Sequence, residues 1–73
     1  FIMYNLFFNN QYNENEFVTT CEKEKIMKEI KKFVKQLNPN FKIYYIRAWK
    51  EGNQTWYDVG SHSEFFFTEE DNL

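Results

Sequence analysis

A single amphipathic helix sets the frame for the rest of this chain. In residues 22–37, EKEKIMKEIKKFVKQL, apolar side chains recur at helical spacing within a stripe about 120° wide. Thr19 and Glu22 form a capping-box pattern, with Thr20 as an alternative cap. Pro39 cannot continue the helix. A single apolar stripe can cover only one face of a sheet. The residues of this stripe are Ile26, Met27, Ile30, Phe33, Val34 and Leu37.

The segments on both sides of this helix have the alternation and the β-branched or aromatic content of strands. Gly52 and Asn53 are suited to a tight hairpin turn, and Ser61–Ser63 to a second turn. For residues 16–20 the alternative is a loop that leads into the helix. The pattern predicts one small α+β domain over residues 1–73, with a single antiparallel sheet in the order ββαβββ and the amphipathic helix packed on one face. The expected strands are residues 3–9, 16–20, 41–50, 55–60 and 64–69.

Aromatic side chains are unusually frequent, with nine Phe, five Tyr and two Trp in 73 residues. Each ring can bury about 150–250 Å², so one interior between helix and sheet cannot hold them all. In a strand, Phe66 must face opposite to Phe65 and Phe67. Alternation leaves open which set lies under the helix. We expect rings on a second face, buried against a protein partner or a second copy in a homodimer. The residues predicted to contact the partner are Arg47, Trp49, Trp56, Tyr57, His62 and Phe66.

Charge and cysteine content narrow the class of protein. A net charge of -2 and a pI near 5.3 argue against general nucleic-acid binding. There is no apolar run long enough to span a membrane and no leader pattern, and Cys21 is the only cysteine. We therefore expect a cytoplasmic protein without a disulfide. Met3 is a candidate natural start, so Phe1, Ile2 and the closing residues 71–73 are treated as candidate vector remnants and left out of the functional interpretation.

Two groups of residues have the chemistry of catalytic or metal sites. Cys21, Asp58 and His62 are the residue types of a thiol enzyme, and a thiolate is favoured at a helix N-terminus, where Cys21 is expected. Asp58, His62 and Glu64 could bind a metal across the final hairpin. No nucleophile motif or repeated ligand motif surrounds them. Cys21 fits a small buried hydrophobe, and Asp58 and His62 fit turn residues. We expect neither an enzyme nor a cofactor or metal.

The face of the helix opposite the apolar stripe carries lysines. Five ammonium groups on one face suit nucleic-acid phosphates or an acidic protein. The alternative function is therefore nucleic-acid or nucleotide binding, either through this lysine face or through aromatic side chains that stack on bases. An ordinary solvated face is the simpler interpretation, because this face has no arginine and no adjacent aromatic side chain. The residues are Lys25, Lys28, Lys31, Lys32 and Lys35.

Two stretches, VTTCEKEKIMKEIKKFV at residues 18–34 and RAWKEGNQTWYDVGSHSEFFF at residues 47–67, resemble small proteins of Gram-positive phages and prophages. Those proteins combine a strand, a helix led by Thr-Cys and a closing hairpin of the kind W-x-D-x-GSH-x-x-FF. The resemblance implies a phage-encoded protein in the host cytoplasm. Many phage proteins of this size bind and inhibit a host protein, including nucleases and anti-phage defence components. It implies no catalytic residue.

Overall fold

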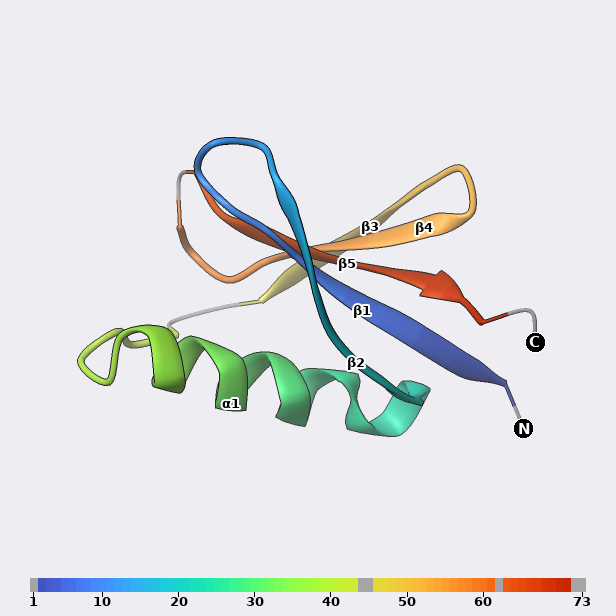
Figure 1. Ribbon diagram of the computed structural model, residues 1–73, viewed down its shortest axis with the longest axis horizontal. Helices are drawn as coiled ribbons and strands as arrows, with labels where there is room; N and C mark the ends of the chain where they lie inside the picture. The colour runs from blue at the N-terminus through green and yellow to red at the C-terminus, as the bar shows by residue number, and fades with distance from the viewer. Residues whose placement is uncertain (1, 44–45, 62, 72–73) are drawn as a thin grey trace.

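The computed structural model describes residues 2–43, 46–61 and 63–71. Within these residues, five antiparallel strands form one sheet in the order β2-β1-β5-β4-β3, and one α-helix packs beneath it (Figure 1). The predicted α+β fold with the chain order ββαβββ is confirmed. The elements are β1 (Met3–Asn9), β2 (Asn15–Glu22), η1 (Lys23–Lys25), α1 (Ile26–Leu37), β3 (Arg47–Glu51), β4 (Gln54–Asp58) and β5 (Phe65–Glu70).

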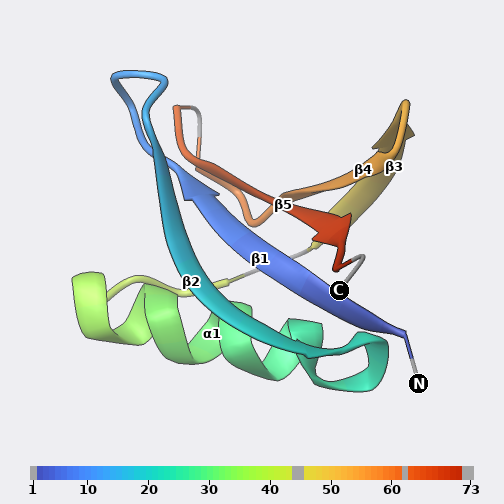
Figure 2. The same cartoon turned by 45° about the vertical axis from the view of Figure 1, so that its right-hand side comes forward.

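The last strand holds the two hairpins together. β5 lies between β1 and β4 and pairs with both, with Phe67 opposite Phe7 of β1 and opposite Trp56 of β4. The β1–β2 and β3–β4 hairpins therefore never touch as strands but are joined through β5. They diverge from each other on the side away from α1 (Figure 2). β2 and β3 are left as the two edges of the sheet.

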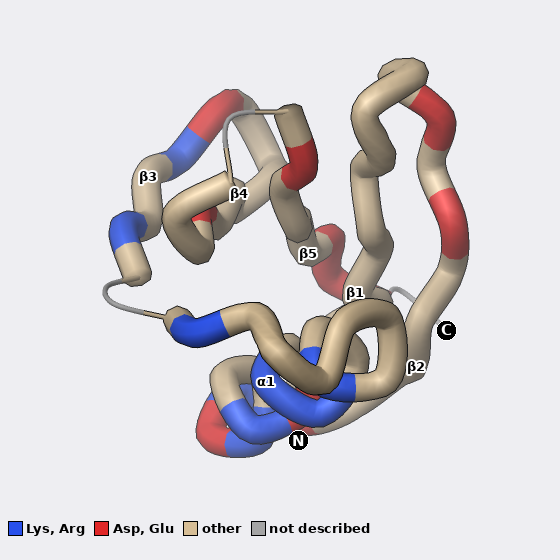
Figure 3. Tube along the Cα trace, turned by 90° about the vertical axis from the view of Figure 1, so that its left-hand side faces the viewer, with Lys and Arg blue, Asp and Glu red and all other residues tan. Residues whose placement is uncertain are grey.

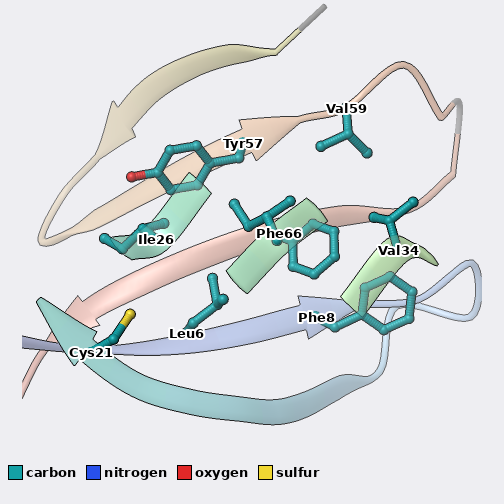
Figure 4. Close-up of a cluster of buried hydrophobic side chains, with 9 residues drawn as sticks. Leu6, Phe8, Cys21, Ile26, Val34, Tyr57, Val59 and Phe66 are labelled. Carbon is teal, nitrogen blue, oxygen red and sulfur yellow. The ribbon is translucent and has the colours of Figure 1, made fainter. Parts of the chain in front are cut away.

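The core lies between α1 and one face of the sheet. Leu6 and Phe66 of the central strands are 0% and 1% exposed, and Ile30 of α1 is 0% exposed. These side chains belong to a cluster that runs the length of the helix (Figure 4). The apolar stripe predicted from the sequence thus packs on the sheet, except that Met27 and Leu37 are exposed.

Two turns use left-handed backbone where the sequence favours it. Asn13 in the β1–β2 loop has a φ of 60°, and Gly52 in the β3–β4 turn has a φ of 61°. Asn and Gly adopt this region most readily. The two hairpins are therefore specified by local turn chemistry as well as by their apolar faces.

The start of the helix differs from the prediction. β2 continues to Glu22, which pairs with Met3, so Cys21 lies in a strand instead of at a helix N-terminus. The helical turn that follows is a 3₁₀ helix, and Glu22 at its N-cap makes no side-chain capping hydrogen bond. The predicted capping box is wrong because strand pairing with β1 takes up Thr19 and Thr20.

The strand predicted over residues 41–50 is also shorter. Residues 41–43 and 46 are not in a strand, Tyr44 and Tyr45 lie outside the described residues, and β3 begins at Arg47. Phe41, Ile43 and Ile46 instead pack in partly buried positions against the core cluster. The apolar content of these three positions reflects packing against the core and not pairing in the sheet.

Candidate functional site: the helix-free face of the sheet

A row of aromatic side chains crosses the face of the sheet that α1 leaves open. Each of the five strands contributes one ring, and the rings occupy successive positions of the strand register, so they are neighbours across the whole sheet. We call this set the aromatic row. From β2 to β3 it consists of Phe17, Phe7, Phe67, Trp56 and Trp49.

The rings of the row contact one another. Phe67 stacks on Phe7 with centroids 4.9 Å apart and on Trp56 with centroids 4.7 Å apart. Phe17 meets Phe7 edge-on at 5.9 Å. Phe65 adds edge contacts to Trp56 at 6.4 Å and to Trp49 at 6.3 Å. Offset-stacked and edge-to-face pairs are the favoured geometries, so the row is ordered before any partner binds.

Mutual packing covers the middle of the row and leaves its ends more open. Phe67 is 4% exposed, whereas Phe17 at the β2 edge is 56% exposed. Phe7, Trp49 and Trp56 are half-buried. At the β3 end the guanidinium of Arg47 lies over the Trp49 ring, 5.7 Å from its centroid. The surface is a ribbon of ring faces and edges with a cation at one end.

Polar side chains border the row along the edge that runs toward the β3–β4 turn. Trp56 Nε1 donates to Gln54 Oε1 (2.9 Å), and Gln54 Nε2 donates to Glu69 Oε2 (2.8 Å). Further along the same border, Thr20 Oγ1 donates to Asn5 Oδ1 (2.6 Å). These bonds fix the border groups and orient the Trp56 indole.

The opposite border is polar as well. Arg47 Nη2 bonds Asp58 Oδ2 at 3.0 Å, and the Asp58 carboxylate also accepts from the Gly60 backbone N–H at 2.9 Å. Asn9 Nδ2 donates to Asn15 Oδ1 at 2.9 Å. The Arg47 side chain remains 70% exposed while that of Asp58 is 8% exposed, so the carboxylate is inside and the guanidinium outside.

The predicted contact residues divide between the two faces. Arg47, Trp49 and Trp56 come together on the helix-free face. Tyr57 and Phe66 point the other way into the core, where they are 9% and 1% exposed, so their side chains are not available to a partner (Figure 4). The prediction that Tyr57 and Phe66 share a surface with the tryptophans is therefore wrong, because successive residues of a strand face opposite sides. His62 lies outside the described residues.

Three members of the row, Phe7, Phe17 and Phe67, were missed by sequence reasoning. The available signal was the alternation of β1 and β5, which separates Phe7 from Leu6 and Phe67 from Phe66. Placing Phe17 needs the β1–β2 register, and this register shifts between Leu6 and Phe7. A one-residue shift sends every side chain beyond it to the other face, and no local pattern announces it.

The five predicted lysines are all exposed, Lys25 at the end of η1 and the other four along α1. Figure 3 shows lysine positions concentrated on the helix, on one side of the strands. Because α1 packs on the face of the sheet opposite the aromatic row, these cations lie away from the row. Glu29 lies among them on the helix. The lysine face and the ring surface thus form two separate surfaces and do not combine in one basic, aromatic site.

Cys21 and Asp58 are also separated by the sheet. Cys21 is 8% exposed in the core, and burial raises the pKa of its thiol, with Glu29 adding to the effect. This environment favours the neutral thiol over the thiolate that nucleophilic chemistry requires. Asp58 is held on the other face by Arg47 and Gly60. Among the described residues, no cluster of three His, Cys, Asp or Glu side chains has the geometry of a metal site.

A cavity of about 330 Å³ opens beside the C-terminal end of α1. Its walls are mostly apolar, and at its polar side Ser61 Oγ lies 3.3 Å from the Glu64 carboxylate. Cys21 is not part of the lining, so the cavity does not bring the thiol to a substrate. The lining residues are Phe8, Val34, Leu37, Asn38, Phe41, Val59, Ser61, Glu64 and Phe66.

Comparison with known proteins gives no match to a family model, to a curated protein or to a solved structure. Within the part of the chain that the structure describes, no helix has the length and apolar character needed to cross a membrane.

Proposed function

We propose that this chain is a non-enzymatic interaction module that binds a partner protein through the helix-free face of its sheet. The observation that carries the proposal is the aromatic row: five rings in register across all five strands, on a face that α1 does not cover. An apolar centre with a polar border is the usual anatomy of a protein interface. Trp and Arg are the residue types enriched at binding hot spots, and Trp49 with Arg47 provides both.

The charges near the row favour a protein over a nucleic acid. Among the described residues of the strands, Glu51, Asp58 and Glu69 share the face of the row with one cation, Arg47. Nucleic-acid binding gains most of its affinity from neutralised phosphates, which these carboxylates would repel. The lysines that could meet phosphates lie on the far side of the sheet, so base stacking on the row and phosphate contact with α1 cannot occur together.

The resemblance to phage and prophage proteins suggests the class of partner. On this basis the partner is a protein of a Gram-positive host, and binding inhibits or modulates it, as expected for a protein that blocks a nuclease or an anti-phage defence component. The chain then acts in the host cytoplasm. The similarity of residues 18–34 and 47–67 and the ring surface together support this class of partner.

Affinity capture from host lysate tests the proposal. The bait variants are Trp49→Ala/Trp56→Ala at one end of the row and Phe17→Ala at the other. Tyr12→Ala is the matched control, because Tyr12 is an aromatic residue that is 73% exposed but lies in the β1–β2 loop outside the row. We expect a partner that is captured by wild type and by Tyr12→Ala and is lost with both row variants, each shown by circular dichroism to be folded.

The same capture experiments distinguish protein binding from the alternative function, nucleic-acid binding. A Lys28→Glu/Lys32→Glu variant changes only the lysine face of α1. Capture that is unchanged by the row variants, but is abolished by this variant or by nuclease treatment of the lysate, would refute the proposal in favour of nucleic-acid binding.

A further inference from the structure

Among the described residues, the sheet has two edges with no further strand beside them, and one of these is the outer edge of β3. β3 spans only Arg47–Glu51, pairs with β4 on one side, and has four exposed residues out of five. An edge strand presents unpaired N–H and C=O groups that can pair with another strand. The edge is visible at the end of the sheet opposite β2 (Figure 2).

The turn beside β3 fixes which backbone groups point outward. Gly52 and Asn53 form a two-residue turn, and Glu51 pairs with Gln54 at its base. The residues that flank such a turn are hydrogen-bonded to each other, and bonded and non-bonded pairs alternate along an antiparallel ladder. Glu51, Trp49 and Arg47 therefore direct their N–H and C=O groups toward β4. Ala48 and Lys50 direct theirs to the free edge.

This edge is complementary to itself. If a second β3 pairs antiparallel with the first about a twofold axis at Trp49, Ala48 of each copy lies opposite Lys50 of the other, and their outward backbone groups form the hydrogen bonds. Arg47 of each copy then lies opposite Glu51 of the other copy, which gives two pairs of opposite charge. Both pairs occupy positions of the ladder that are not hydrogen-bonded, where side chains approach most closely. We propose that a second copy of this chain binds here, forming a homodimer by β3–β3 pairing in this register.

Other arrangements lack this match. An axis at Ala48 places Arg47 opposite Trp49, and an axis at Lys50 places two lysines opposite each other, so neither forms the Arg47–Glu51 pairs.

At the other edge of the sheet, β2 has charged residues of one sign only, Glu16 and Glu22, and its register is interrupted between Leu6 and Phe7 of its partner strand β1. Bulges and like charges are common protections against edge pairing.

The proposed dimer has consequences for the ring surface. Pairing about an axis perpendicular to the sheet places both α1 helices on one side and both aromatic rows on the other. Trp49 of one copy then lies opposite Trp49 of the second copy, so the two rows meet at the dimer axis. The inference goes beyond the proposed function and does not depend on it, because the dimer forms without any other protein.

Sedimentation velocity over about 10 µM to 1 mM tests the proposal on the whole chain. Five residue pairs make a small interface, so we expect a reversible equilibrium in which the dimer grows with concentration. Glu51→Lys should raise the dimer dissociation constant at least about tenfold, because both opposite-charge pairs become repulsive. Glu16→Lys makes the same charge change at the β2 edge and should leave the dissociation constant unchanged.

A second variant and a second measurement address the backbone. Ala48→Pro removes an outward N–H without removing a bond to β4, and proline is tolerated at strand edges, so this variant should fold and remain monomeric. Amide hydrogen exchange at Ala48 and Lys50 should slow as the protein concentration rises. A protein that is monomeric throughout, or a dimer that persists in Glu51→Lys and Ala48→Pro but dissociates in Phe17→Ala, would overturn the proposal.

Discussion

At the scale of single residues, Phe66 joins the helix to the sheet. Its ring lies 5.1 Å from that of Phe8 on β1 and 5.7 Å from that of Phe33 on α1, and it is 1% exposed. We expect Phe66→Ala to lower the free energy of unfolding by about 3–5 kcal/mol, because the cavity cannot close between two layers. Phe17→Ala should cost less than about 1 kcal/mol, because Phe17 is 56% exposed.

Denaturant unfolding followed by circular dichroism measures both values. If Phe66→Ala does not fold, Phe66→Leu provides the comparison, with an expected cost of about 1.5 kcal/mol. Equal losses for Phe17 and Phe66 variants would contradict the assignment of the two rings to an outer and an inner face.

Two buried groups of the core predict how stability depends on pH. Burial raises the pKa of the Cys21 thiol and of the Tyr57 hydroxyl, with Glu29 adding to the effect at Cys21. In each case the fold favours the neutral, protonated form. The contribution of each group to the free energy of unfolding is therefore complete when the pH is below the pKa of that group in the unfolded chain. It is lost as the pH rises through the pKa of the group in the folded protein. We expect the free energy of unfolding to fall from about pH 8.5 for Cys21 and about pH 10 for Tyr57.

Unfolding curves recorded from pH 7 to above pH 10 test this expectation, with Cys21→Ala and Tyr57→Phe as the comparison proteins. Each variant removes one titrating group, so its stability should decline less steeply in alkali than that of wild type. Variants that follow the same slope as wild type would show that other groups cause the decline.

At the scale of elements, the β3–β4 hairpin depends on one backbone conformation. Gly52 has a φ of 61°, and an added Cβ would meet nothing within 4 Å. The whole cost of Gly52→Ala is therefore backbone strain, about 1–2 kcal/mol. Asn53→Ala in the same turn should cost less than about 0.5 kcal/mol, since Asn53 does not have a positive φ. Thermal or denaturant unfolding of the two variants measures the difference, and similar costs would contradict this account.

The elements also show which parts of the fold the sequence could predict. The helix, the strand at residues 3–9 and the Gly52 turn follow from local patterns, and each is present. The segment 41–46 was predicted as strand because it is rich in apolar residues, but Phe41 and Ile43 pack against the core without a strand neighbour. Cys21 stays in β2 because β1 is long enough to pair with it at Tyr4. Both differences arise from contacts distant in the chain.

The candidate site was less predictable for the same reason. Trp49, Trp56 and Arg47 were identified by residue type, but the row exists only once β5 inserts between the hairpins and aligns Phe67 with Phe7 and Trp56. Alternation correctly separated Phe66 from Phe67 and could not decide which one the helix covers, because both faces of β5 are aromatic. Only the placement of α1 decides it.

At the scale of the whole molecule, edge pairing predicts a particular size and shape. The radius of gyration of one copy is 11.7 Å. Strands lie about 4.8 Å apart, so two five-stranded sheets joined edge to edge have centres about 24 Å apart and a joint radius of gyration of about 17 Å. Small-angle X-ray scattering should therefore show a doubled forward scattering together with a radius near this value at concentrations where the dimer predominates.

The shape of the dimer in solution distinguishes edge pairing from a dimer in which the two aromatic rows pack face to face. Two copies packed with their aromatic rows face to face would have sheets only about 10 Å apart and would be more compact. Glu51→Lys should return the radius to that of a single copy if the edge is used, because the Arg47 contact becomes repulsive. A compact dimer that is unaffected by Glu51→Lys would place the interface on the ring surface instead and would leave that surface unavailable to another protein.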